Sequence, residues 1–227
     1  MKSRKAIKNF FSIPLSFRGV FNTCETLLGK SSGGYIISWH DLPAEIFKSQ
    51  VECLYPSEPI PLDELIKRYK MGKSIKRCFA ITFDDGVEST VQNVSRVCKK
   101  MNWPVTFYIP TGYLNGDSLP YQKVQFINEK LPEDNYIIPD TLKKFEKKIF
   151  NKKQLIQLLT KMLYVEHFSI IDNFLDYFIK KISDTEKTSS LKNWRPKPVT
   201  WTEIEKLSKN PIISFQSHSI SHTAVSS

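Results

Sequence analysis

The sequence predicts an α/β fold, and three observations favour this class. Short apolar runs typical of buried strands occur at residues 35–39, 78–81, 105–109 and 212–216. Segments with apolar residues at helical spacing lie between them. Chemically reactive side chains directly follow several of the runs, as they do at the strand ends of α/β folds. The chain has 227 residues, 41% of them hydrophobic, which suffices for one sizeable core.

Two adjacent carboxylates follow the run at 78–81, in the stretch Thr82-Phe83-Asp84-Asp85-Gly86. The glycine permits a sharp turn, and valines at helical spacing follow it. Asp84 and Asp85 are therefore expected at a strand-to-helix junction, where α/β enzymes often place catalytic groups. For an isolated Asp-Asp-Gly, the alternative is a solvated turn in which one carboxylate caps the helix.

Two of the four histidines, His218 and His222, lie four positions apart in a serine-rich stretch after the run at 212–216. Imidazoles at this spacing share one helical face and can also converge on an irregular turn. Neutral imidazole pairs are common zinc ligands, and a carboxylate from elsewhere can complete a set of three. The alternative is a pair of surface histidines in a polar tail.

Together the two motifs resemble the polysaccharide deacetylase family, the NodB-like carbohydrate esterases of family four. The resemblance implies that Asp84 is the general base. It implies that Asp85, His218 and His222 bind one divalent metal ion, zinc first, with cobalt or nickel as alternatives. It further implies a distorted (β/α) barrel and the removal of acetyl groups from an amino sugar or polysaccharide by metal-assisted hydrolysis. The substrate would then be an acetylated glycan.

His40 follows the predicted strand at 35–39 directly. A lone histidine in this place is more often structural. One branch of the family carries its catalytic histidine after an N-terminal strand that ends in Tyr-His, and Trp39-His40 stands at the matching place. The resemblance thus implies that His40 is the general acid. Asp41 is expected to be a turn residue or to orient the imidazole.

The run at 105–109 ends at Pro110-Thr111-Gly112, a turn-forming sequence. The family has a similar turn at the rim of its metal site, so Thr111 is a candidate for substrate contact. A purely structural role in the turn is the alternative.

The sequence predicts four segments: a basic and aromatic segment at 1–34, the first part of the deacetylase domain at 35–118, a helical insertion at 119–195, and the continuation of the domain at 196–227. Compared with the family, the barrel is expected to be incomplete at its C-terminal end. A partner or a missing segment would then complete it.

Apolar stripes predict three helices in the insertion, around 142–150, 155–163 and 168–179. A capping-box spacing at Thr200 and Glu203 predicts a further helix that runs to about residue 209.

The net charge of +10 is spread along the chain and is interpreted as solvated helix faces, without a specific nucleic-acid site. The basic and aromatic residues 1–21 are interrupted by polar residues and proline, so they are not expected to form a secretory signal or a membrane span. They form a candidate peripheral membrane contact or a helix on the barrel. A cytoplasmic or membrane-peripheral location is expected. The four cysteines form no zinc module, and Cys78 and Cys98 are expected to be buried thiols.

Three functional hypotheses remain open. The first is a metal-dependent polysaccharide or amino-sugar deacetylase. The second is an inactive, truncated relative that binds a glycan or a protein. The third is a basic protein that binds nucleic acid or a membrane surface and matches both motifs by chance.

Overall fold

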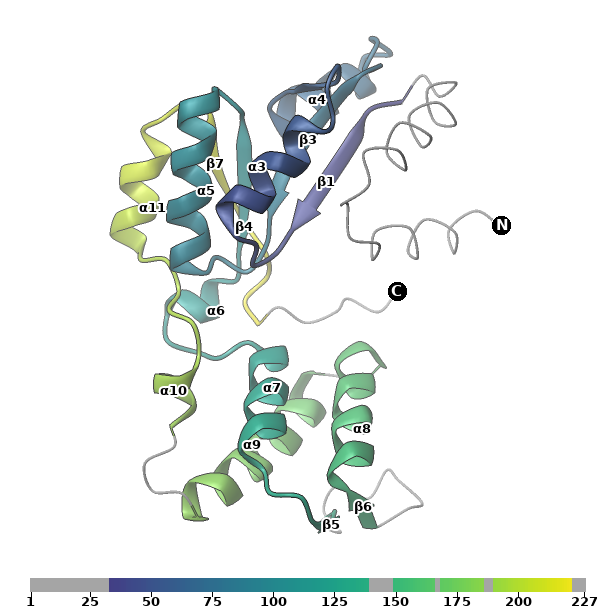
Figure 1. The fold of residues 1–227 in the computed structure, drawn as a ribbon, viewed down its shortest axis with the longest axis vertical. Helices are drawn as coiled ribbons and strands as arrows, with labels where there is room; N and C mark the ends of the chain where they lie inside the picture. The colour runs from purple at the N-terminus through teal and green to yellow at the C-terminus, as the bar shows by residue number, and fades with distance from the viewer. Residues whose placement is uncertain (1–32, 139–148, 166–167, 186–189, 222–227) are drawn as a thin grey trace. The chain divides into compact units, whose positions relative to one another are not determined.

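The computed structural model describes residues 33–138, 149–165, 168–185 and 190–221. The described residues form two compact units. Unit 1 comprises residues up to Asp84, Ser89–Tyr108 and Thr202–Gln216, and unit 2 comprises Asp85–Glu88, Ile109–Trp201 and the residues from Ser217 on. Predictions for residues 1–32, including the membrane contact at 1–21, lie outside the described residues. Figure 1 shows the fold.

Unit 1 contains a five-stranded sheet, except for the last residues of β4 and β7. The strand order is β1-β3-β4-β7, and the short strand β2 also pairs with β3. Its strands are β1 (Tyr35–Trp39), β2 (Glu58–Pro59), β3 (Cys78–Phe83), β4 (Val105–Ile109) and β7 (Ile213–Ser217). Both β1 and β4 pair parallel with β3, in a register that places Ser38 opposite Thr82 and Thr82 opposite Thr106. The α/β class is therefore confirmed. The strands of the described residues form an open sheet and do not close into a barrel.

Strand β3 pairs with strands on both sides, and all six of its residues are buried. A strand covered on both faces reads as a continuous apolar run, as this one does. On one face Phe83 packs edge-on against Phe47 of α3 (Ala44–Glu52), with ring centroids 5.1 Å apart. On the other face Ala80 packs in a cluster with Leu65 of α4 (Leu62–Lys70). Helices α3 and α4 therefore cover opposite faces of the sheet.

Two further helices of unit 1 run side by side in Figure 1. They are α5 (Glu88–Met101) and α11 (Trp201–Ser208), and Gln92 of α5 donates a hydrogen bond to Glu203 of α11. Helix α11 begins directly after Thr200, the first residue of the predicted capping box, and ends one residue before the predicted boundary. Cys98 of α5 and Cys78 of β3 are buried free thiols, as predicted.

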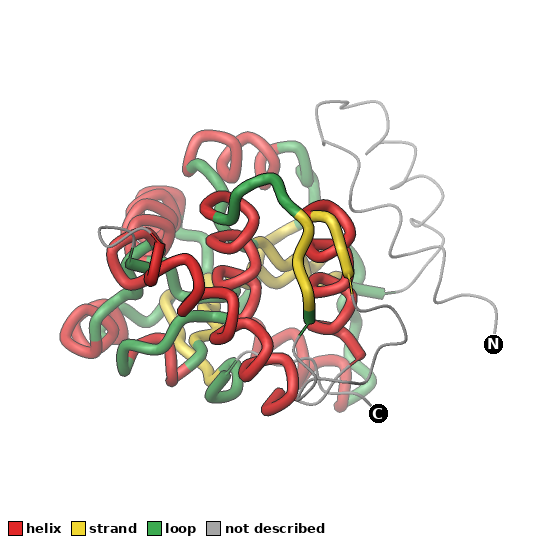
Figure 2. Tube along the Cα trace, turned by 90° about the horizontal axis from the view of Figure 1, so that it is seen from below, coloured by secondary structure: helices red, strands yellow, loops and turns green. Residues whose placement is uncertain are grey.

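Unit 2 is built mainly from helices, and its largest apolar cluster lies among α7, α8 and α9. Its elements are α6 (Thr111–Leu114), α7 (Pro120–Lys130), β5 (Asn135–Ile137), β6 (Ile149–Asn151), α8 (Lys152–Val165), α9 (Phe168–Thr185) and α10 (Leu191–Trp194). Helices α8 and α9 cover the second and third predicted stripes. Helices, red in Figure 2, make up far more of the described chain than strands, which are yellow. No helix in the described ranges is long and apolar enough to cross a bilayer.

The helix predicted around residues 142–150 is wrong at its C-terminal end. Ile149 and Phe150 belong to strand β6, which pairs antiparallel with β5 and places Phe150 opposite Tyr136. Phe150 and Tyr136 are both buried in the apolar cluster of unit 2. Alternating burial in a short strand pair thus replaces the expected helical stripe, and residues 139–148 lie outside the described part.

Candidate active site

Three polar side chains meet at the ends of β1 and β3, all within unit 1. The Ser38 hydroxyl donates a hydrogen bond of 2.9 Å to Oδ2 of Asp84. Nε2 of His40 lies 3.8 Å from the same oxygen. The backbone N–H of Asp84 donates to the carbonyl of Trp39 at 2.9 Å, which extends the pairing of the two strands by one residue. The predicted base and the predicted acid therefore lie side by side.

The exposure of these two groups differs in a way that suits proton transfer. The Asp84 side chain is 17% exposed, whereas the His40 side chain is 61% exposed. Asp84 is thus held in a fixed position, and the imidazole of His40 remains open to solvent and to a ligand. Their separation of 3.8 Å lies within the range of an ion pair and beyond that of a hydrogen bond.

The Asp41 side chain makes its hydrogen bond to Thr90 and not to the imidazole of His40. Its Oδ1 accepts a hydrogen bond of 2.5 Å from the hydroxyl of Thr90, a buried residue in the first turn of α5. Of the two roles expected for Asp41, this geometry matches the structural one, because it ties the loop after β1 to a helix.

Asp85 begins unit 2 and is almost completely buried, with 3% of its surface exposed. Its backbone has a φ of 73°, a left-handed conformation that few residues other than glycine adopt. Gly86 follows with a φ of 68°, and a Cβ there would lie 2.7 Å from Cδ1 of Ile109. Such strained backbone occurs at functional sites more often than elsewhere. The buried Asp85 side chain contacts Tyr121 of the same unit.

Tyr121, in the first turn of α7, donates its hydroxyl to Oδ2 of Asp85 at 3.2 Å. Burial, and then the charge of Asp85, raise the pKa of the Tyr121 phenol above its ordinary value. The phenol therefore remains protonated and acts as a donor. The sequence did not point to Tyr121, because it lies in the segment expected to be a separate insertion and nothing local marks it.

The second motif is held by backbone hydrogen bonds within unit 2. The N–H of His218 donates to the carbonyl of Ile109 at 2.9 Å. The N–H groups of Thr111 and Gly112 donate to the carbonyls of Ser219 and Ile220 at 3.1 and 2.9 Å. Ile109 thus contacts both motifs, since Gly86 packs against its side chain and His218 binds its carbonyl. His218 is therefore bonded to Ile109 directly, and Asp85 is the chain neighbour of Gly86, which contacts Ile109.

Thr111 takes part in this arrangement through its main chain. It is the first residue of α6, and its side chain is half-buried. The contact that fixes its place is the backbone hydrogen bond to Ser219. Substrate contact by Thr111 stays a prediction.

The chemistry of the donor set fits a divalent metal ion. Asp85 offers a buried carboxylate and His218 a half-buried imidazole, and these are ligand types that zinc prefers. The third predicted ligand, His222, lies outside the described residues. Within the described ranges no group of three or more histidine, cysteine, aspartate or glutamate side chains is close enough to hold a metal. Two of the three predicted ligands, Asp85 and His218, lie in the described part of the chain.

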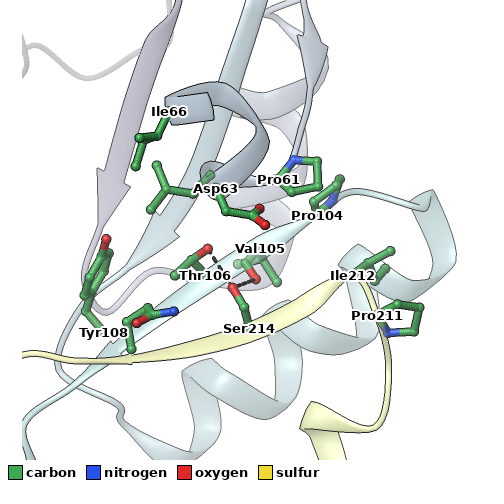
Figure 3. Close-up of a pocket in the computed structure, with 12 residues that line it drawn as sticks. Pro61, Asp63, Ile66, Pro104, Val105, Thr106, Tyr108, Pro211, Ile212 and Ser214 are labelled. Carbon is green, nitrogen blue, oxygen red and sulfur yellow. Dashed lines mark hydrogen bonds between the residues drawn. The ribbon is translucent and has the colours of Figure 1, made fainter. Parts of the chain in front are cut away.

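A separate cleft of about 420 Å³ lies in unit 1, between α4 and the strands β4 and β7. Figure 3 shows Asp63 of α4 on one side of it, and the hydrogen-bonded hydroxyls of Thr106 and Ser214 on its floor. None of the predicted site residues lines this cleft. It is the part of the sheet face that α4 leaves uncovered.

The comparison with protein families agrees with the resemblance that the motifs give. The family model for polysaccharide deacetylases matches residues 71–149, a range that includes Asp84 and Asp85 but neither His218 nor His222. No curated protein matches the chain. The structure of the BpsB deacetylase domain from Bordetella bronchiseptica is similar over 83% of this chain, with 13% sequence identity and a TM-score of 0.39. This chain covers 55% of that one. The resemblance given by the motifs is confirmed, and the chain is similar to the NodB-like polysaccharide deacetylases.

Proposed function

We propose that this chain is a metal-dependent hydrolase that removes acetyl groups from an amino sugar or a polysaccharide. One observation carries the proposal: Ile109 contacts both motifs, through its side chain at Gly86 and its carbonyl at His218. Two stretches far apart in the sequence are thereby held next to each other. A chance match of two motifs gives no reason for such an arrangement.

Asp85, His218 and His222 are the proposed ligands of one divalent ion, zinc first and cobalt or nickel as alternatives. A divalent ion supplies Lewis acidity, which activates water and polarises an acetyl carbonyl. The burial of Asp85 supports its part, because a buried carboxylate needs a compensating partner. The hydroxyl of Tyr121 is one such partner, and a cation would be another.

Asp84 is the proposed general base, and its role is to take the proton from the attacking water. The hydrogen bond from Ser38 supports this role, because it holds one carboxylate oxygen in place. His40 is the proposed general acid, which gives a proton to the departing amine of the sugar. Its exposure supports this role, because a leaving group must reach the imidazole from solvent.

The proposed substrate class is an acetylated glycan or amino sugar. Its support is the family match over residues 71–149. The bond cleaved would be the amide bond of an N-acetyl group, a carbon–nitrogen bond outside the peptide backbone.

Acetate release from acetylated chito-oligosaccharides, after loading with zinc, cobalt or nickel, tests the proposal. Asp85→Ala should lose the metal and the activity together. Asp84→Asn should keep the metal, and its turnover should fall by about 10²–10⁴-fold, the usual effect of losing an acid–base group. Bound metal is measured by mass spectrometry in each sample.

Two outcomes would overturn parts of the proposal. If folded wild-type protein takes up none of the three metals, the proposal of a metal-dependent hydrolase is wrong. Full activity in Asp84→Asn would show that Asp84 is not the general base. Metal uptake without acetate release from any acetylated glycan would favour the second hypothesis, a binding module derived from a deacetylase.

A further inference from the structure

We propose that Tyr121 is a positioning residue for the metal centre and that it orients the Asp85 carboxylate through a hydrogen bond. The inference rests on the proposed function, since it assigns Asp85 as a metal ligand. It adds a residue that neither motif contains. Tyr121 lies in α7, whereas the motifs lie at the ends of β3 and β7.

The Tyr121 ring is held by its neighbours, so its hydroxyl has a defined place. The ring packs on a small apolar cluster formed by Val87, Tyr113 and Leu119. Leu119 is fixed in turn, because its backbone N–H donates to the side chain of Gln122 at 3.1 Å. The hydroxyl then reaches Oδ2 of Asp85 at 3.2 Å. The donor comes from a packed helix start and from the same unit as Asp85.

The hydrogen bond acts on the rotational freedom that the backbone leaves to the Asp85 side chain. The left-handed backbone at Asp85 sets the direction of its Cα–Cβ bond. Rotation of the carboxylate about its own side-chain bonds is still open. A donor bound to Oδ2 selects one rotation, and the carboxylate then presents its electron pairs in a fixed direction. Outer partners of this kind commonly change metal affinity by about 10–100-fold.

Tyr113 provides a matched control for the test. It is fully buried in the cluster against which the half-buried Tyr121 packs, and its hydroxyl donates to the carbonyl of Pro196. Tyr113→Phe therefore also removes one tyrosine hydroxyl, and the hydrogen bond lost goes to Pro196 and not to Asp85. Tyr121→Phe keeps the ring and removes only the hydroxyl that contacts Asp85.

The experiment measures metal binding in the full chain for the wild type, Tyr121→Phe and Tyr113→Phe. Zinc affinity comes from competition with a chelating dye, and the absorption spectrum of bound cobalt reports the ligand geometry. We expect Tyr121→Phe to bind zinc about 10–100-fold more weakly and to shift the cobalt spectrum. Tyr113→Phe should keep both within error. Thermal unfolding of the metal-free proteins checks that the two variants are equally folded.

Three results would overturn the inference. Equal zinc affinity and an unchanged cobalt spectrum in Tyr121→Phe would show that Tyr121 does not position the metal ligand. The proposed function would not be affected. Equal losses in both tyrosine variants would show a general packing effect. If the folded wild type binds neither zinc nor cobalt, the proposed metal centre is wrong, and the proposed role of Tyr121 is wrong as well.

Discussion

Ser38 donates its hydroxyl to Oδ2 of Asp84 across 2.9 Å, and this oxygen also lies 3.8 Å from Nε2 of His40. Ser38 and His40 are two residues apart, one in strand β1 and the other directly after it. A single carboxylate oxygen is thus placed between a hydroxyl and an imidazole. The strand pairing sets the position of all three groups, because β1 and β3 are in parallel register.

Ser38→Ala should lower kcat for acetate release by about tenfold and leave KM unchanged, because a hydrogen bond to a charged group contributes roughly 1.5–3 kcal/mol. The lower end applies since Ser38 is exposed. Ser38→Thr, which keeps a hydroxyl, should restore most of the rate. Ser214→Ala is the control, because it removes another exposed serine hydroxyl of the sheet that bonds Thr106. Equal effects of Ser38→Ala and Ser214→Ala would contradict the prediction.

Gly112→Ala should weaken zinc binding by about tenfold, the effect of moving a support of a metal ligand. A Cβ at Gly112 would lie 2.6 Å from the carbonyl oxygen of Ile220, so the turn that carries His218 must shift. Zinc titration of the variant measures the change. Gly72→Asn is the control, because Gly72 has open space around it and asparagine tolerates its φ of 65°. Unchanged zinc affinity in Gly112→Ala would show that this turn does not set the position of a ligand.

Lys123→Met should lower the free energy of unfolding by about 1–3 kcal/mol at pH 7, because two carboxylates lose their cation. Nζ of Lys123 lies 2.5 Å from Asp172 and 2.7 Å from Asp176, and its side chain is only 12% exposed. The contact joins α7 to α9. Urea unfolding measures the loss, with the exposed Lys180→Met on α9 as the control.

The contribution of Lys123 should disappear at high pH. Burial lowers the pKa of Lys123, but the hydrogen bonds and charges of Asp172 and Asp176 outweigh burial, so the pKa is raised. A raised pKa in the folded state means that the stabilisation is fully present below the unfolded value of about 10.4. It is lost as the pH rises through the folded value. The difference between wild type and Lys123→Met should therefore shrink above about pH 10.4. A constant difference would exclude the ion pair as its cause.

Cys98 should resist alkylation in the native protein. Burial raises the pKa of its thiol to about 12, so the reactive thiolate is scarce at pH 8. Cys53 is only half-buried and should react faster. Mass spectrometry after a short exposure to iodoacetamide separates the two sites. Equal labelling of Cys98 and Cys53 before unfolding would contradict the burial of Cys98.

The features that the sequence predicted well are local. The apolar runs that became β1, β3 and β4 show in a few consecutive residues, and so do the polar residues that directly follow β1 and β3. Parallel strands then bring residues that follow neighbouring strands to one edge, which explains why His40 and Asp84 lie together. The strand runs place His40 and Asp84 after neighbouring strands, and the resemblance to the family is what singled out His40.

The contacts that the sequence did not predict join distant positions. Tyr121 meets Asp85 across 36 residues of sequence, and Ser38 meets Asp84 across 46. No local pattern marks either donor. Helix α7 was missed for a related reason, since its buried residues follow no clear amphipathic stripe: Pro120, Gln122, Val124, Phe126 and Ile127. Tertiary packing decided that helix, and the strand pair β5–β6 as well.

The pairing of β4 with β7 has a consequence for how the chain folds. Thr106 and Ser214 bond across 108 residues of sequence, whereas the apolar cluster of unit 2 is drawn from residues 124–194 within that interval. Closing a long loop costs entropy before its contacts form, so sheets with distant partners assemble slowly. We expect α7, α8 and α9 to gain protection in pulsed hydrogen exchange before β4 and β7 do. On a ribosome, β7 would leave the exit tunnel after that helical core, so the edge of β4 would stay open to other chains for that interval.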